Sequence, residues 1–556
     1  MSDARNASGC SPTISLGDYS PVADGVTDDT PALFRCFTDA AIAASMAGAA
    51  VVTIPPGTYA IAGVTPIPLA SSTTVFAHGA RFILPRRLGD RARVVVFEGR
   101  DLCDFHWEGG HFQGFCFDPD SRENTWEPNA SARVFAISTS PGGTTSDLLF
   151  RGIRADGVAG AVVNVHGCMH DHDGREVDTY ADNVSVEACN FTRCGKFMWD
   201  YGFLWQRIVW PEEYTRDQVE LAHRYFHTHL IREQVAMDDG ETRVRYDAAP
   251  GELPAADEAG GRPGDGSTVC FYGDVLPANV VRGKRYHIVG AGTGWIHVAD
   301  TPEGEPIRFQ GRSGPAAKLI HSLHKAYFRL YAPHGCGPGK GGVDLVACRN
   351  SIVTGCRLSA LGDTMHIRAC DTTVFSGNQI VGARMGAFFL AEWCRNSTVV
   401  GNTVDGTNGS RVMSVEKSNE DVTIMGNTFR GGGRGSWINQ PRNLVMQGNI
   451  FINNTTKCER DSLRGRRSYE TGDYEIYPEI YFTLHEDAGT YGPVIVRDNV
   501  IVTGPECREA IAFGPNGHDI TVEGNAVSGG GRAISVDPSC TRVCAAGQTI
   551  SSSGAR

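Results

Sequence analysis

Several features are missing from this 556-residue sequence, and each absence excludes a class of protein. It contains no run of 18 apolar residues, so we expect no membrane-spanning helix. The first residues, MSDARNASGC, lack an apolar stretch, so we expect synthesis in the cytoplasm without a secretory signal. Positive charge is in deficit, and the net charge of −12 argues against a nucleic-acid partner. It also disfavours binding of an acidic polymer by overall charge, although it leaves room for local basic patches.

No CxxC pair occurs among the 17 cysteines, which disfavours a zinc site of that type. The cysteines are scattered, and many lie in or beside expected strands. Without an export signal, we expect them to be reduced residues of the core or of turns. Examples are Cys189, Cys348, Cys356 and Cys370.

Seven short phrases recur at nearly even spacing in the second half of the chain. Each phrase ends a short β-branched run and is followed by another short apolar run, without a helical pattern between them. Their last residues are separated by 22, 24, 25, 22, 50 and 26 positions, a period typical of repeat proteins. The phrases are VTGC (353–356), FSGN (375–378), VVGN (399–402), IMGN (424–427), MQGN (446–449), VRDN (496–499) and VEGN (522–525).

The recurring asparagine indicates how these repeats fold. Asparagine tolerates the left-handed backbone conformation, and stacked coils would let its amides hydrogen-bond as a ladder. We therefore predict an all-β fold, a parallel β-helix solenoid. The uneven coil of 22–26 residues favours the right-handed form, because left-handed β-helices follow a strict hexapeptide repeat. A β-propeller or a sandwich is the alternative. Asn190 is expected to occupy the same turn.

An N-terminal helix is expected to cover the first coil. Thr30 followed by Pro31 is typical of a helix start, and the residues from Pro31 to about Met46 are apolar on most sides. Val51 to Ile54 would then form the first strand. Because the core of a solenoid is open at its end, an apolar helix here would cap it.

The segment ADGVTDDTPAL (23–33) followed by VVTIPPGTY (51–59) resembles the N-terminal signature of the pectate-lyase-like superfamily of right-handed β-helix proteins. It is most similar to the branch shared by polygalacturonase-related hydrolases and phage tailspikes. The resemblance implies a polysaccharide ligand and, for a tailspike, a homotrimer that assembles with other phage tail proteins. The branch includes hydrolases, lyases, epimerases and non-catalytic virion parts, so the resemblance leaves the reaction open. The Asn-Thr-Asp and Gly-His-Gly signatures of polygalacturonases are absent, and Asp363 alone represents their Gly-Asp-Asp strand.

The pattern divides the chain into five expected segments. The insertion among them is predicted to combine an amphipathic helix, from Pro211 to about Gln234, with a small β module at 276–309. The module resembles one that recurs in phage tail and tail-fibre proteins, although a generic hairpin insertion would give the same pattern. The segments are a cap with the first strand (1–63), a first β-helix part (64–205), the insertion (206–340), a second β-helix part (341–530) and an irregular tail (531–556).

Counting backward from the ladder positions, and forward from Asn190 to Asp200, places a set of polar residues on one outward face, which Asp363 would reach from the preceding bend. This face would line a groove fitted to a long polymer. Glycosidic cleavage needs two carboxyl groups on either side of the bond, and tryptophans can stack on sugar rings. Each acid could equally be a solvated surface residue. The candidate catalytic residues are Asp200, Asp363, Glu392, His366, Arg368 and Glu416. The candidate substrate-binding residues are Trp199, Tyr201, Trp205, Trp393, Trp437, Asp344 and Asn439.

A second polar cluster lies at HGCMHDHDGREVDTY (166–180). Its acids Asp171, Asp173 and Asp178 suit Ca²⁺, its histidines suit a transition metal, and the whole segment would equally suit the polar wall of a groove. Because the spacing matches no firm motif, we expect no cofactor, with Ca²⁺ as the alternative.

Three functions are compatible with these features. We favour a phage tailspike-type depolymerase in a virion tail, which hydrolyses glycosidic bonds of a bacterial surface glycan. The second is a free bacterial polysaccharide hydrolase or lyase, since Arg368 between Asp363 and Glu392 keeps lyase chemistry open. The third is a structural or adhesive virion protein without catalysis.

Overall fold

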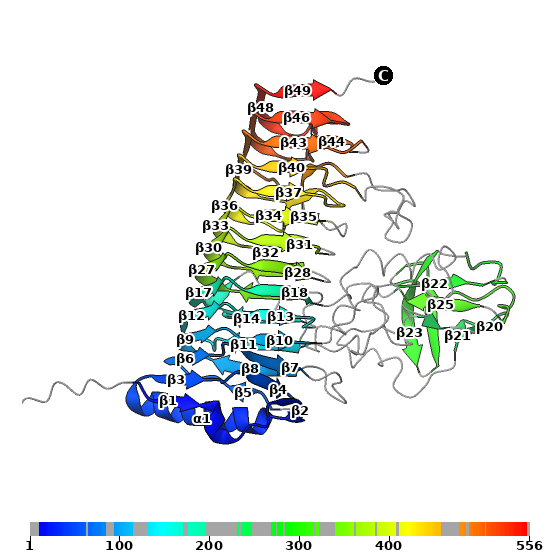
Figure 1. The fold of residues 1–556 in the computed structure, drawn as a ribbon. Helices are drawn as coiled ribbons and strands as arrows, with labels where there is room; N and C mark the ends of the chain where they lie inside the picture. The colour runs from blue at the N-terminus through cyan, green and yellow to red at the C-terminus, as the bar shows by residue number, and fades with distance from the viewer. Residues whose placement is uncertain are drawn as a thin grey trace, which may run out of the picture. The chain divides into compact units, whose positions relative to one another are not determined.

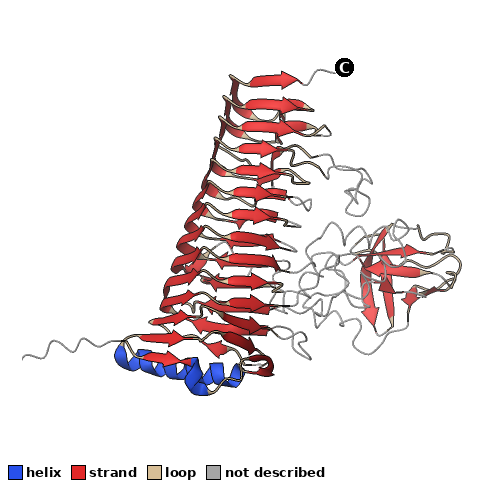
Figure 2. Cartoon of the chain, in the orientation of Figure 1, coloured by secondary structure: helices blue, strands red, loops and turns tan. Residues whose placement is uncertain are grey.

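The computed structural model describes most of the chain, and its strands wind into a stack of coils (Figures 1 and 2). The described residues are 11–62, 65–84, 94–114, 132–158, 160–170, 176–195, 231–232, 235–246, 268–273, 275–281, 284–292, 294–301, 303–315, 317–321, 340–360, 363–383, 386–406, 411–456, 477–484, 489–505 and 507–552.

Three long sheets, A, B and C, each gain one strand from nearly every coil, and all neighbouring strands in them are parallel. Sheet A contains β1 (Thr13–Ser15), β3 (Ala50–Thr53), β6 (Thr73–Phe76), β9 (Cys103–Glu108), β12 (Thr145–Arg151), β17 (Ala181–Glu187), β27 (Cys348–Thr354), β30 (Asp371–Ser376), β33 (Arg395–Val400), β36 (Glu420–Met425), β39 (Arg442–Gln447), β42 (Val494–Arg497), β45 (His518–Glu523) and β48 (Thr541–Ala546).

Sheets B and C complete each coil. Sheet B contains β2 (Asp24–Asp28), β4 (Gly57–Ala60), β7 (Ala80–Ile83), β10 (His111–Gln113), β13 (Arg154–Asp156), β18 (Asn190–Cys194), β28 (Arg357–Ala360), β31 (Gln379–Val381), β34 (Thr403–Asp405), β37 (Thr428–Arg430), β40 (Ile450–Ile452), β43 (Val500–Thr503), β46 (Ala526–Gly529) and β49 (Thr549–Ser552). Sheet C contains β5 (Ile67–Pro68), β8 (Val94–Arg100), β11 (Ala132–Ser138), β14 (Ala161–His166), β26 (Lys340–Val346), β29 (Asp363–Arg368), β32 (Gly386–Glu392), β35 (Arg411–Val415), β38 (Ser436–Asn439), β41 (Ile480–Thr483), β44 (Glu509–Phe513) and β47 (Arg532–Val536).

The asparagines of the repeated phrases form the predicted ladder between sheets A and B. Asn402 is buried; its Oδ1 accepts from the backbone N–H of Asn378 at 2.9 Å, and its Nδ2 donates to Oδ1 of Asn427 at 2.9 Å. The left-handed residue of this turn is the preceding glycine, such as Gly401 with φ +65°, and not the asparagine. Asparagine is therefore needed for its amide, which satisfies backbone groups that the turn buries.

Cysteines extend this ladder and build a second row. Cys189, and not Asn190 as predicted, occupies the ladder position: its Sγ donates to the Phe150 carbonyl at 3.6 Å, as an asparagine amide does elsewhere. Cys348, Cys370 and Cys394 stack at the turn from sheet C to sheet A, where the Cys370 Sγ donates to the Leu345 carbonyl at 3.5 Å. The described cysteines form no disulfide.

The N-terminal helix α1 (Thr30–Ala47) packs against the first coils, below them in Figure 1. Asp29, and not Thr30, stands at its N-cap, and the buried Asp29 carboxylate accepts from the backbone N–H of Val22 at 2.7 Å. Two strands, β1 and β2, and a 3₁₀ turn (Leu16–Tyr19) precede the expected first strand at Val51–Ile54. In the described part of the chain, no helix is long and apolar enough to cross a membrane.

A second compact unit comprises 200–337 together with 459–475. Its described strands form one antiparallel sheet around a small core of its own. In sheet order they are β19 (Ile231–Arg232), β25 (Lys318–His321), β22 (Thr268–Tyr272), β23 (Arg285–Gly292), β24 (Trp295–Ala299), β21 (Arg243–Arg245) and β20 (Ala236–Met237).

Two sequence predictions about irregular regions need correction. The helix expected from Pro211 to about Gln234 does not include Ile231–Arg232, which pair with β25, while 211–230 and 233–234 lie outside the described residues. The expected irregular tail at 531–556 instead continues all three sheets through β47, β48 and β49. Its sequence lacks the GN phrase, so the ladder could not reveal it.

Replacing Asn402 with alanine should destabilise the solenoid. The substitution removes the acceptor for the Asn378 N–H and two donors to neighbouring coils, and buried polar groups left unpaired cost roughly 1–3 kcal/mol each. The free energy of unfolding in urea should fall by about 3 kcal/mol. Gln379→Ala is the control, because Gln379 is exposed at the start of β31. It should change the free energy of unfolding by less than about 0.5 kcal/mol.

Candidate functional site on the outward face of sheet C

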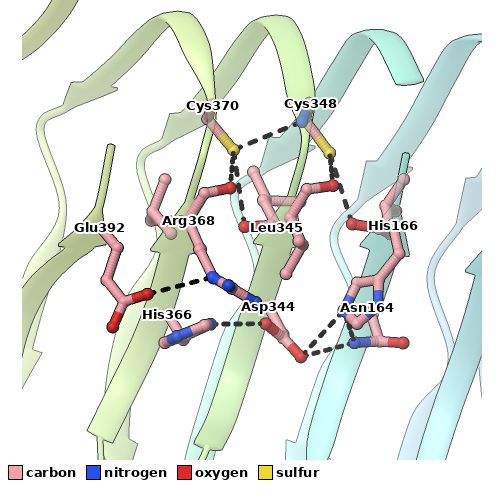
Figure 3. A network of polar contacts seen from close by, with 12 residues as sticks. Asn164, His166, Asp344, Leu345, Cys348, His366, Arg368, Cys370 and Glu392 are labelled. Carbon is pink, nitrogen blue, oxygen red and sulfur yellow. Dashed lines mark hydrogen bonds and ion pairs between the residues drawn. The ribbon is translucent and has the colours of Figure 1, made fainter. Parts of the chain in front are cut away.

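The outward face of sheet C carries a line of polar residues. Along β26, Val343 and Leu345 face the apolar core, so Asp344 between them faces outward. The register pairs Asn164 of β14 with Asp344, and Asp344 with His366 of β29. Three polar side chains therefore lie on one line across three successive strands, as Figure 3 shows.

Asp344 is the centre of this line. Its side chain is 2% exposed, and both of its oxygens have partners. Oδ1 lies 2.9 Å from Nδ1 of His366, while Oδ2 accepts from Nδ2 of Asn164 at 2.6 Å and lies 3.2 Å from Nε2 of His166. A buried carboxylate with this many donors orients them. Asp344, predicted from the sequence to bind substrate, is thus placed to position two histidines.

Glu392 lies on β32, one coil beyond His366, and two cations contact it. Arg368 pairs with it in register, with Nε 3.3 Å from Oε2, and the Lys417 ammonium contacts Oε1. Burial acts to raise the pKa of Glu392, but the contact with Lys417 and the charge of Arg368 outweigh it, so the pKa lies below its ordinary value. Glu392 is therefore ionised at neutral pH.

Glu416, which directly follows β35, is shifted in the opposite direction. Burial raises the pKa of Glu416 to about 7. The charges of Arg411 and Lys417 oppose this rise. The charges of Asp363 and Glu392 add to it. A substantial fraction of Glu416 is therefore protonated at neutral pH, beside an ionised Glu392.

Two tryptophans flank these carboxyl groups, and each is in contact with a cation. The Arg368 guanidinium lies 5.1 Å from the ring centroid of Trp393, and that of Arg411 lies 4.4 Å from the ring centroid of Trp437. The Trp437 indole also donates to Oγ1 of Thr483 at 2.7 Å. The rings are thus fixed in orientation next to the charged groups.

The structure gathers most of the predicted site residues from the second half of the chain. Asp363, at the start of β29, is buried and accepts from the Gly386 N–H at 2.8 Å. Asn439 is also buried, and its amide donates to Thr483 and to the Leu484 carbonyl, so it holds a turn. The residues on or beside this face are Asp344, Asp363, His366, Arg368, Glu392, Trp393, Glu416 and Trp437.

Other predicted residues are not part of this cluster. Trp199, Asp200, Tyr201 and Trp205 lie outside the described residues, as do Asp171 and Asp173. Asp178 is exposed in the short hairpin of β15 (Cys168–Met169) and β16 (Val177–Thr179). Within the described ranges, no three His, Cys, Asp or Glu side chains gather where they could hold a metal ion.

Sequence counting missed Asn164, His166, Arg411 and Lys417 as members of this face. Asn164 and His166 lie 25 and 23 residues before the ladder position Cys189, because the β15–β16 hairpin separates β14 from β17, whereas Asp344 lies 12 residues before Cys356. A usable signal was present: VVNVH (162–166) alternates apolar and polar residues as MHIR (365–368) does. A count of ten residues back from Asn427 falls on Lys417, but the longer connection expected in that coil favoured Glu416 in its place.

A family model described as the right-handed β-helix region matches residues 334–466. The chain is a right-handed parallel β-helix. This confirms the fold class that the asparagine phrases predicted, and it is the fold of the pectate-lyase-like superfamily that the N-terminal signature resembles.

Several solved structures are similar to this chain at low identity. The mannuronan C-5 epimerase AlgE6 A-module of Azotobacter vinelandii is 12% identical, with a TM-score of 0.38, over 97% of this chain and 99% of that one. The Streptococcus pneumoniae surface adhesin PfbA is 12% identical, with a TM-score of 0.45, over 96% and 93%. The tailspike of E. coli bacteriophage HK620 is 11% identical, with a TM-score of 0.41, over 98% and 67%. Among curated proteins, none matches this sequence.

Removing the Asp344 carboxylate should destabilise the β-helix. Asp344→Ala leaves the Asn164 amide and two imidazoles without their shared buried partner, and we expect the free energy of unfolding to fall by about 3 kcal/mol. Asp178→Ala, at an exposed position of the β15–β16 hairpin, is the control and should change it by less than about 0.5 kcal/mol. Equal stability of the two variants would show that Asp344 does not organise this face.

Proposed function

We propose that the outward face of sheet C binds a polysaccharide and hydrolyses its glycosidic bonds. Glu416 is the general acid, and ionised Glu392 is the base or nucleophile. One observation carries the proposal: two carboxyl groups on neighbouring coils have pKa values shifted in opposite directions. Environments that separate the pKa values of two nearby acids are characteristic of an acid–base pair.

The spacing of a β-helix suits this chemistry. Neighbouring coils lie about 4.8 Å apart, and the two carboxyl groups of glycosidases lie roughly 5–9.5 Å apart. Asp363 contributes through its charge, which helps to keep Glu416 protonated. Because the coils repeat along the solenoid, an extended chain lying across them would meet successive strands of the same face.

Hydrolysis is favoured over elimination by the pairing of the cations. A lyase needs a basic side chain beside a neutralised uronate, whereas both Arg368 and Lys417 are engaged with Glu392. Trp393 and Trp437 present aromatic surface beside the carboxyl groups, where a sugar ring can stack.

The N-terminal signature supports the finer proposal. Its resemblance to the tailspike branch favours a bacterial surface glycan as the substrate, a homotrimer as the active form and a place in a virion tail among other tail proteins. A free bacterial hydrolase with the same face is the second candidate, favoured by the acid–base pair itself, which does not require a virion.

Glu416→Gln should abolish most glycan cleavage. A general acid contributes about 10²–10⁴-fold to the rate, so reducing-end release from a panel of capsular and lipopolysaccharide glycans should fall by at least about 100-fold. The wild-type rate should also fall as the pH rises through about 7, because only protonated Glu416 can donate.

Glu523→Gln, an exposed acid in sheet A, is the matched control and should keep full activity. Full activity of both Glu416→Gln and Glu392→Gln would overturn the assignment. An unsaturated product that absorbs in the ultraviolet would show elimination in place of hydrolysis.

The trimer is tested separately by size. Light scattering from the purified chain should give three times the 59.8 kDa mass of one copy if the tailspike assignment holds. A monomer with full cleavage activity would instead favour the free hydrolase.

A further inference from the structure

One face of the second unit's sheet collects arginine and aromatic side chains. The register of β21 and β24 pairs Arg243 with His297 and Arg245 with Trp295. Between them in sequence, Val244 and Ile296 are buried in the unit's core. Because side chains alternate along strands, the arginines, Trp295 and His297 share the opposite face.

Trp295 forms a fixed support for Arg243. The Arg243 guanidinium lies 4.7 Å from the centroid of the indole ring. The ring also lies against the backbone of Gly292, its cross-strand partner, where an added Cβ would come within 2.5 Å of a ring carbon. His297 meets the indole edge with ring centroids 4.9 Å apart, and its Nδ1 lies 2.9 Å from the Thr242 carbonyl. Arg243 is thus held in place before any ligand arrives.

The face carries an excess of positive charge. Arg245 pairs with Asp238, and Arg312 Nε lies 3.5 Å from the same carboxylate. Arg243 has no carboxylate within ion-pair distance among the described residues. Two guanidinium groups therefore share one carboxylate and the Arg243 group has none in the described part of the chain, in a protein whose net charge is −12. This is the local basic patch that the overall charge leaves room for.

We propose that this face is a second carbohydrate site, which binds the carboxylate group of an acidic saccharide through Arg243. The planar guanidinium matches a carboxylate with two parallel hydrogen bonds, and its aromatic support keeps the fork oriented. The inference rests on the proposed function, because it takes the same class of polymer as the ligand. It adds that the polymer contains acidic sugars and that the second unit holds it without cleaving it.

The size of the patch favours a saccharide over a nucleic acid. Duplex DNA carries one charge per about 1.7 Å, and its binders commonly neutralise six or more phosphates. An excess of two positive charges fits one or two sugar carboxylates, with His297 and Trp295 at the edge of the ring.

Binding to the full chain tests the proposal. Titration calorimetry would use tetragalacturonate, tetramannuronate and a hyaluronan tetrasaccharide, with maltotetraose as the neutral counterpart and a 12-nucleotide single-stranded DNA as the competing class. At least one acidic tetrasaccharide should bind, while maltotetraose should not. Arg243→Ala should weaken that binding at least 10-fold, and Arg243→Lys about 3-fold, because lysine keeps the charge without the fork. Arg357→Ala, an exposed arginine in sheet B, is the matched control and should leave it unchanged.

Three results would overturn the proposal. These are binding by none of the acidic tetrasaccharides, equal binding by wild type and Arg243→Ala, and tighter Arg243-dependent binding of the DNA. Equal thermal unfolding midpoints of wild type and Arg243→Ala would exclude misfolding. If Arg243→Ala is unstable, the binding of Arg243→Lys decides the test.

The two proposals fail separately. Arg243→Ala should retain the cleavage rate on a short oligosaccharide, whereas Glu416→Gln should retain the Arg243-dependent binding. A failed cleavage test would therefore contradict only the acid–base pair, and a failed binding test would contradict only the Arg243 site.

Discussion

Parallel pairing between successive coils is the constraint on which the rest of this molecule depends. It places every side chain beside the residue one coil further on, so each row must be chemically compatible along its length. Amides and thiols share the same rows because both can donate to the carbonyls that the turns bury. Charged groups must alternate, since like charges opposite one another destabilise a sheet. One row of sheet A shows this alternation in Asp182, Arg349, Asp371, Arg395, Glu420 and Arg442.

In the candidate site, the charges that lie beside each acid determine how readily that acid ionises. Asp344 has histidine neighbours on both sides, and Glu392 lies between Arg368 and Lys417, so both acids are compensated. Glu416 has acids among its neighbours and lies in partly buried surroundings, so its pKa rises. The same stacking rule that fixes the register thus separates the acid–base properties of two chemically identical side chains. A rigid solenoid keeps both groups at fixed distances from a bound chain.

The asparagine phrases were sufficient to predict the fold because the amide is required by the turn and recurs at its period. The same reasoning explains the errors. Cys189 and Asn190 are adjacent, and a thiol can donate to a carbonyl as an amide does, so Asn190 was predicted at a ladder position that Cys189 occupies. Asn164 and His166 were missed because the β15–β16 hairpin lengthens the spacing between their strand and the ladder. The last coil was not predicted because its turn carries no GN phrase, although its strands pair as the earlier ones do.

The burial of the site residues and their pKa shifts could not be predicted from the sequence for a different reason. Alternation places Asp344 and Asn439 outward or in turns, but only the packed structure shows that neighbours cover both side chains. Likewise, burial raises the pKa of Glu416, whereas the contact with Lys417 and the charge of Arg368 lower that of Glu392, and spacing alone reveals neither effect. Spacing finds the face, and the neighbours of each group determine its chemistry.

The stacked cysteines have a consequence for how the protein responds to its chemical surroundings. Burial raises the pKa of the Cys370 and Cys394 thiols well above the ordinary value, and the Sγ of each donates to a backbone carbonyl. Thiolate is the form that oxidants, alkylating reagents and disulfides react with. These two thiols therefore act as hydrogen-bond donors in their turns, with little thiolate available for such reactions. Cysteine content in such a solenoid records turn chemistry and carries no information about the compartment.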